Sequence, residues 1–185
     1  MNKRILAIAM IMVLVTAGLF AAPPTAKVEL VASVGEVPAN SGIRLVEGNG
    51  LPGGVDPVTF DPLFFSAPSE IQMATGVDTA LTTASGYFTV LVRRPTVSGF
   101  TVSVSATPLK LTGQEKYLAY TITGTGFSIA LPAIAGPNGA ASYSGTASAL
   151  SILRHEKPLR YIIPRDATAT QGVYTADITM TLTTT

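Results

Sequence analysis

The chain alternates between apolar and polar residues over several short segments, which is the pattern of strands whose two faces meet different surroundings. The longest of these segments is Gly172–Thr185, in which Thr or Asp separates the apolar residues Tyr174, Ala176, Ile178, Met180 and Leu182. A strand of this length must pair along both edges or leave a row of backbone N–H and C=O groups open. The pattern therefore raises the question of what pairs with it.

A second alternating segment, Lys27–Val34, lies near the start of the chain. One of its sides carries Val28, Leu30, Ala32 and Val34, and the other carries Lys27, Glu29, Val31 and Ser33. This alternation predicts a strand with one buried face. Residues 22–36 are therefore interpreted either as an N-terminal extension or as the first strand of the domain that follows, residues 37–185.

Further short strands are predicted between these two segments. They cover Tyr87–Val92, Phe100–Ser105, Tyr117–Thr123, Phe127–Leu131 and Leu159–Ile163. Gly124–Gly126 predicts a hairpin turn, and the glycines and prolines of residues 49–57 predict a loop. Residues 58–78 show no clear period, and residues 147–153 fit more than one element. Short strands at roughly 8–12-residue spacing, with no helical period, predict an all-β sandwich or barrel.

The first 21 residues have the features of a secretory signal peptide. Lys3 and Arg4 form a positive start, Ile5–Phe20 carries no charge, and small residues follow at Ala21, the expected cleavage site. An uncleaved membrane anchor is the alternative. Because the apolar run is shorter than the ~20 residues that span a bilayer, we expect cleavage, a secreted protein and no membrane span in the mature chain.

The composition argues against some classes of partner and against disulfides as the support of the fold. Removing Lys3 and Arg4 from the twelve basic residues leaves ten against eleven acidic ones, so the mature chain is almost neutral. Near-neutral charge argues against a nucleic-acid partner and against a polybasic membrane patch. The exported chain has no cysteine, so its core or its partners must hold the fold together. Charged residues make up only 12% of the chain, which suggests a surface that something covers.

No residue pattern predicts an enzyme, a cofactor or a metal site. The single histidine, His155, lies in the charged run Arg154–Lys157, which we interpret as a solvated turn between two strands. Asp56 and Asp61 have oxygens suitable for calcium, but their spacing matches no standard calcium loop. Arg93–Arg94 is expected to end a strand rather than to bind an anion. A secreted hydrolase would need a nucleophile and a base, and no such pair is recognisable.

The two alternating segments resemble parts of chaperone–usher pilins. In that family a glycine lies fourteen residues from the C-terminus, alternating apolar residues follow it, and the penultimate residue is commonly Tyr. Here Gly172 occupies the glycine position and the apolar residues keep the register, whereas Thr184 replaces the tyrosine. Lys27–Val34 resembles the donor strand of that family. The segment Phe100–Thr123 is similar to spore-coat-U-like and colonisation-factor-like fimbrial subunits, of which the latter also lack cysteine.

This resemblance implies an incomplete immunoglobulin-like β-sandwich whose groove is filled by the N-terminal strand of the next subunit. The inserting side chains would be Val28, Leu30, Ala32 and Val34. One wall of the groove would be the closing strand with Gly172, Tyr174, Ala176, Ile178, Met180 and Leu182. The partners would be other copies or related subunits, preceded by a periplasmic chaperone. The head-to-tail contact would build a fibre in the periplasm or at the cell surface.

Two functions from different classes therefore remain open. The first is a secreted structural subunit of a fimbria-like surface fibre assembled by β-strand addition. The alternative is a self-complete secreted β-sandwich that binds a carbohydrate or an envelope protein, with Lys27–Val34 paired inside its own chain. The absence of tryptophan weakens sugar stacking as the binding mode of this alternative.

Overall fold

The computed structural model of the chain describes residues 26–35, 42–50, 68–79, 81–94, 99–146 and 153–184. All of its regular elements are strands, and no helix occurs in these residues. Within them, nothing helical is long and apolar enough to cross a membrane. The predicted signal peptide (residues 1–21), Asp56 and Asp61 lie outside the described residues.

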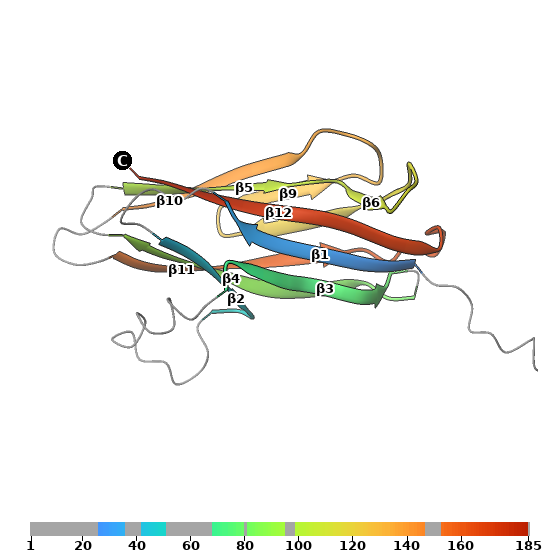
Figure 1. The fold of residues 1–185 in the computed structure, drawn as a ribbon, viewed down its shortest axis with the longest axis horizontal. Helices are drawn as coiled ribbons and strands as arrows, with labels where there is room; N and C mark the ends of the chain where they lie inside the picture. Colours follow the sequence, from blue (N-terminus) through green and yellow to red (C-terminus); the bar gives the residue numbers. More distant parts are fainter. Residues whose placement is uncertain are drawn as a thin grey trace, which may run out of the picture.

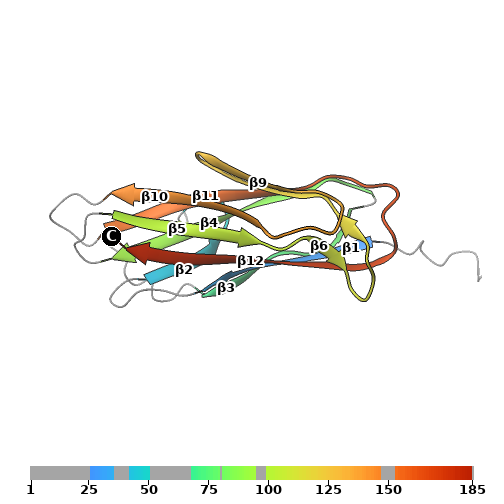
Figure 2. The same cartoon turned by 90° about the horizontal axis from the view of Figure 1, so that it is seen from above.

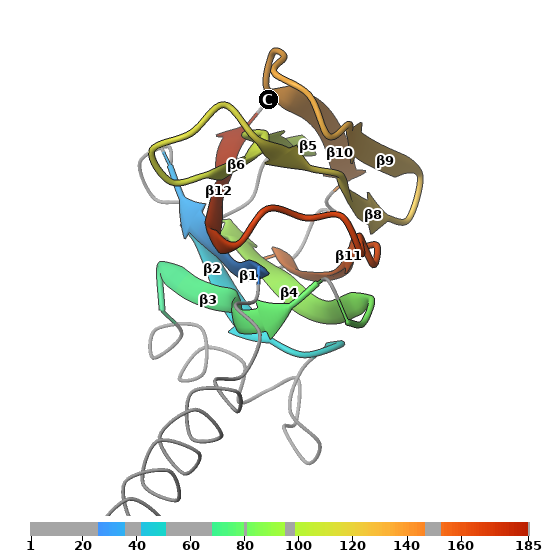
Figure 3. The same ribbon diagram turned by 90° about the vertical axis from the view of Figure 1, so that its right-hand side faces the viewer.

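The strands form two sheets that pack face to face, so the predicted β-sandwich is confirmed (Figures 1 and 3). The seven-stranded sheet contains β1 (Ala26–Val34), β3 (Glu70–Asp78), β5 (Gly99–Ala106), β6 (Leu109–Leu111), β7 (Tyr117–Leu118), β10 (Gly139–Thr146) and β12 (Gly172–Thr184). The five-stranded sheet contains β2 (Gly42–Glu47), β4 (Ala84–Arg94), β8 (Tyr120–Gly124), β9 (Phe127–Leu131) and β11 (Leu153–Ile163).

The strand order places the start of the described chain in the middle of a sheet. In the seven-stranded sheet the order is β10-β5-β12-β1-β3, with β6 paired to β12 and β7 paired to β6 (Figures 1 and 2). In the five-stranded sheet the order is β2-β4-β11-β8-β9. β1 therefore lies between β12 and β3, and neither neighbour adjoins it in sequence.

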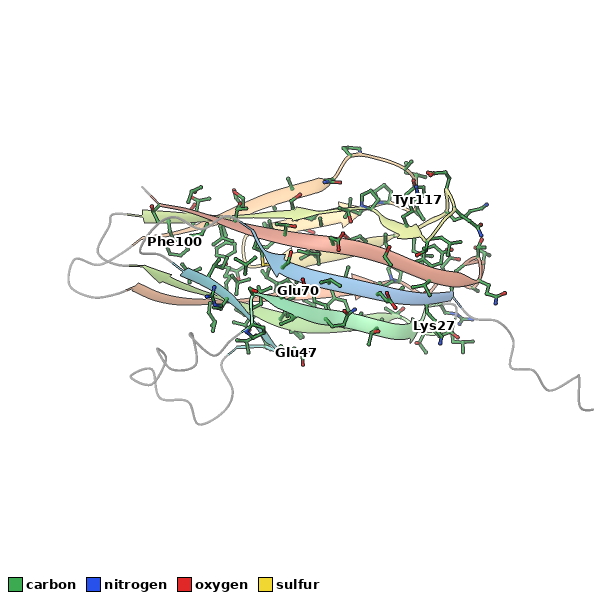
Figure 4. All side chains as sticks on the ribbon, viewed as in Figure 1. Lys27, Glu47, Glu70, Phe100 and Tyr117 are labelled. Atoms are coloured by element: carbon green, nitrogen blue, oxygen red, sulfur yellow. The ribbon has the colours of Figure 1, made fainter. Side chains whose placement is uncertain are left out.

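The core lies between the sheets and follows from the alternation of each strand. One strand from each sheet illustrates this: Phe88, Val90 and Val92 of β4 and Phe100, Val102 and Val104 of β5 are buried in the same core cluster. Phe100 lies between the two layers at one end of the molecule (Figure 4). The residues between these positions lie on the outer faces of the sheets, although Thr89 and Leu91 of β4 are also completely buried there.

Most strands predicted from the sequence are confirmed, but two interpretations are wrong. Tyr117–Thr123, predicted as one strand, is interrupted at Ala119 and forms β7 and β8, which belong to different sheets. Arg154–Lys157 is not a turn, because it forms the first part of β11 and pairs with β4 over its whole length. The charged run resembles a loop in the sequence, but the backbone ladder with β4 continues through it. The predicted hairpin at Gly124–Gly126 joins β8 to β9, and Gly126 there has a positive φ of 86°.

Four strands were not predicted: β2, β3, β6 and β10. In β2, the buried Ile43 and Leu45 lie on either side of Arg44 and could have been recognised, although the strand is short and Val46 weakens the alternation. β10 consists largely of Gly, Ala and Ser, which give a weak hydrophobic signal. β3 lies within residues 58–78, the segment without a clear period, and its pairing with β1 shifts register twice.

Thr79 follows β3 and offers a test of the core. Its side chain is fully buried, and its hydroxyl has no hydrogen-bond partner among the described residues. We expect Thr79→Val to raise the free energy of unfolding by about 1 kcal/mol, because it removes a buried hydroxyl that has lost its hydration. Urea denaturation would measure the change. Thr82→Val, at an exposed hydroxyl, is the control and should stay within about 0.5 kcal/mol.

Candidate functional site

The candidate site is the place that β1 occupies, which we call the β1 slot. Its walls are the facing edges of β12 (Gly172–Thr184) and β3 (Glu70–Asp78). β1 pairs with β12 in parallel over nine consecutive residues without a break in register. On its other edge it pairs with β3 in antiparallel fashion. β1 thus provides backbone partners to two strands that would otherwise have unpaired edges in the middle of the sheet.

The slot brings the predicted inserting side chains together with the predicted wall. Four inserting residues lie directly opposite four wall residues: Val28 and Tyr174, Leu30 and Ala176, Ala32 and Ile178, Val34 and Met180. Val28, Leu30 and Ala32 are completely buried, and Val34 is partly buried against the core. All the apolar wall residues from Tyr174 to Leu182 are buried as well. The contact therefore combines a backbone ladder with a continuous apolar face.

The opposite wall of the slot is irregular. Between its pairs with Val28 and Leu30, β3 has one extra residue, and a second shift lies between Leu30 and Val31. Gly76, in the first of these bulges, has φ 65°, a conformation that glycine adopts without strain. The two bulges interrupt the alternation of β3, which explains why residues 70–78 gave no clear period; residues 58–67 of that segment lie outside the described residues. Lys27 and Glu70 lie towards opposite ends of this pairing (Figure 4).

Tyr161 of β11 links β3, the irregular wall of the slot, to the five-stranded sheet. Its hydroxyl donates a hydrogen bond of 2.7 Å to the carbonyl of Met73, which lies at the second bulge of β3. Burial of the ring, and to a lesser extent the negative charge of Glu47, raises the pKa of Tyr161, so the hydroxyl keeps its proton and remains a donor. Because a carbonyl displaced from a ladder needs a new partner, Tyr161 stabilises the bulge.

Close approaches define both ends of the slot. Beyond β1, the Gly35 amide donates to the Met180 carbonyl at 2.7 Å, and a Cβ on Gly35 would lie 2.8 Å from the Thr181 methyl. At the other end, Gly172 pairs with Ala26 and has φ 134°, which a side chain rarely adopts. A Cβ on Gly172 would also lie 2.6 Å from Leu111. Both glycines therefore permit the register that the slot requires.

The remaining candidate residues that the structure describes are known by their backbone positions. His155 lies within β11, where its backbone pairs with Val92 of β4. Arg93 and Arg94 end β4, as the sequence predicts. In the part of the chain that the structure describes, no three His, Cys, Asp or Glu residues gather to hold a metal ion. The β1 slot holds an extended strand through backbone pairing on both edges and buried apolar side chains.

Comparison with known proteins assigns no family to this arrangement. A scan against protein-family models finds no match, and a search of curated proteins finds no match either. The function is therefore inferred from the strands themselves and from the way in which β1 is held between β12 and β3.

Proposed function

We propose that this protein is a secreted structural subunit of a fimbria-like surface fibre assembled by β-strand addition. In the fibre, β1 of one copy occupies the β1 slot of the next copy. The observation that carries the proposal is the position of β1 between β12 and β3. A strand in that position supplies the slot with both its backbone partners and its apolar side chains, which is how strand addition gives affinity and register.

The connectivity supports exchange because β1 is not linked to either neighbour by a hairpin. β2 and the loop after it separate β1 from β3, and the rest of the described chain separates it from β12. The seven residues 35–41 that join β1 to β2 span at most about 25 Å. An exchanged β1 therefore reaches only a copy in direct contact. In the next copy, β1 would make the same contacts that it makes within its own chain in this structure, as in domain swapping. When such an exchange continues from copy to copy without forming a closed ring, it builds a fibre.

The alternative is a self-complete secreted β-sandwich that binds a carbohydrate or an envelope protein. One observation favours it: β1 pairs within its own chain in this structure. The two proposals differ in whether β1 stays there. A periplasmic chaperone belongs only to the fibre proposal, in which it would protect the slot before exchange takes place.

A pair of single-cysteine variants tests the exchange. Ser33 of β1 and Thr179 of β12 are register partners, and both are partly exposed. Neighbouring strands are about 4.8 Å apart, within the range that a disulfide bridges, and the chain has no other cysteine. We expect co-expressed Ser33→Cys and Thr179→Cys chains, with tags of different length, to form a mixed disulfide-linked dimer. Non-reducing gel electrophoresis of cell-surface material would show it.

Two controls make the result decisive. The double variant Ser33→Cys/Thr179→Cys should give disulfide-linked ladders if β1 exchanges, and only an internal disulfide in monomers if it does not. If β1 were inserted antiparallel to β12 with Leu30 still opposite Ala176, Ser33 would lie opposite Val173 instead of Thr179. A mixture of Ser33→Cys and Val173→Cys chains therefore detects insertion in that direction. Monomers alone in both mixtures, with an internal disulfide in the double variant, would contradict the fibre proposal and leave the self-complete sandwich.

A further inference from the structure

We propose that a depression on the outer face of the five-stranded sheet binds an acidic sugar, meaning a saccharide that carries a carboxylate. The depression lies on the opposite sheet from the β1 slot, and the proposal does not depend on fibre assembly. Its volume is about 330 Å³. It is lined by Tyr87 of β4, Pro158 and Arg160 of β11, Thr123 of β8, Thr125 of the following turn, and Asn49.

The register of three adjacent strands sets the floor of this depression. Arg160 lies directly opposite Tyr87 on one side and Thr123 on the other. The three side chains therefore form one row across β4, β11 and β8 on the outer face of the sheet. Because sheet positions are rigid compared with loop positions, the row presents an aromatic ring, a guanidinium and a hydroxyl in a fixed arrangement.

The rim of the depression is also held in place. Thr89 is completely buried, and its hydroxyl accepts a 2.6 Å hydrogen bond from the Gly50 amide and donates a 3.0 Å bond to the Gly48 carbonyl. The Gly48 amide in turn donates to the Tyr87 carbonyl at 3.0 Å. Asn49 lies between these two anchored glycines. Asn49 lines the depression together with Tyr87, and its amide group can donate and accept hydrogen bonds.

The charge of the depression selects an anion. The Arg160 guanidinium lies 5.7 Å from the centre of the Tyr87 ring, and Tyr87 is 45% exposed. This cation–π contact orients the guanidinium without neutralising it. Arg160 forms no salt bridge with any described residue, and no carboxylate lines the depression. A charged guanidinium with free donors is suited to a bidentate carboxylate.

The other lining groups indicate a sugar rather than a simple anion. Asn49, Thr123 and Thr125 supply neutral donors and acceptors of the kind that bind hydroxyl groups. The exposed part of the Tyr87 ring offers an apolar surface for the C–H face of a sugar ring. The volume is at the lower end of ligand sites, which suits a single saccharide unit with the rest of a glycan in solvent.

Titration calorimetry and saturation-transfer NMR of the purified protein test this proposal. The probes are glucuronic acid, galacturonic acid and N-acetylneuraminic acid, with glucose as the neutral counterpart. We expect at least one acid to bind and glucose to bind about tenfold more weakly or not at all. Arg160→Gln should weaken the binding of that acid by about tenfold or more, and Tyr87→Leu should reduce the transfer signals of its ring protons.

The matched control is Arg165→Gln, which removes an exposed arginine outside the depression and should leave the affinity unchanged. Thermal denaturation confirms that each variant is folded. Three results would overturn the proposal: no binding of any of the three acids, unchanged binding by Arg160→Gln, or binding of acetate as strong as that of the sugars. None of these variants alters β1, so a negative result leaves the fibre proposal intact.

Discussion

A chain that lacks residues 1–34 is expected to lose its folded monomer, and a peptide of residues 26–35 is expected to restore it. The deletion removes Val28, Leu30 and Ala32, which are completely buried in the core. Burial of a valine or leucine side chain contributes about 1.5–3 kcal/mol. The deletion also exposes the facing edges of β12 and β3. The combined loss is comparable to the whole stability of a typical domain, about 5–15 kcal/mol.

Circular dichroism and size-exclusion chromatography would measure this loss. The truncated chain should aggregate or show a melting transition far below that of the chain that begins at residue 26. Addition of the peptide at a 1:1 ratio should restore a folded complex, whereas the same peptide with Leu30→Asp should not. A truncated chain that melts at the same temperature as the longer chain would show that β1 is dispensable.

Restoration by the peptide has a consequence beyond stability. It would demonstrate that the β1 slot accepts a strand from another molecule, which is the elementary step of fibre assembly. A truncated chain that unfolds and is not restored would instead indicate that β1 folds only as part of its own chain. That result would favour the self-complete sandwich over the fibre subunit.

The sequence predicts β1 and β12 well because their alternation is uninterrupted. Nothing within Lys27–Val34 or Gly172–Thr185 breaks the period, and one face of each strand is buried along most of its length. β3 could not be predicted in the same way, since its two bulges shift the inward-facing positions and the shift depends on its pairing with β1. In β11, the charges of Arg154–Lys157 conceal a strand whose backbone is fully paired with β4.

The two candidate sites also differ in how far the sequence predicts them. Both sets of side chains that meet in the β1 slot are recognisable by their alternation, but the parallel direction of their pairing comes from the sheet order. The acidic-sugar site has no sequence signature, because Tyr87, Thr123 and Arg160 are far apart in the chain. They form a row only through the register of three strands. Such a site follows from topology rather than from any local motif.

Gly86→Ala is expected to lower the free energy of unfolding by about 2–4 kcal/mol, a large effect for a single methyl group. Gly86 lies opposite Tyr161 in the pairing of β4 with β11. A Cβ at this position would lie 2.7 Å from the Tyr161 hydroxyl oxygen and 2.8–2.9 Å from two ring carbons. The ring must move, and its hydrogen bond to Met73 in the wall of the β1 slot is then lost. Thermal denaturation should show a decrease of roughly 5–15 °C.

A double-mutant cycle would identify Tyr161 as the cause. In a Tyr161→Leu background the ring is absent, so Gly86→Ala should cost almost nothing or even stabilise the strand slightly, since alanine loses less backbone entropy than glycine. The coupling between the two positions should therefore reach about 2 kcal/mol. Gly136→Ala is the matched control, because a Cβ there meets no atom within 4 Å. Additive effects of the two substitutions would show that the glycine has another role. Strong coupling would establish that a glycine of the five-stranded sheet positions the tyrosine that holds β3, and through β3 the slot in which β1 lies.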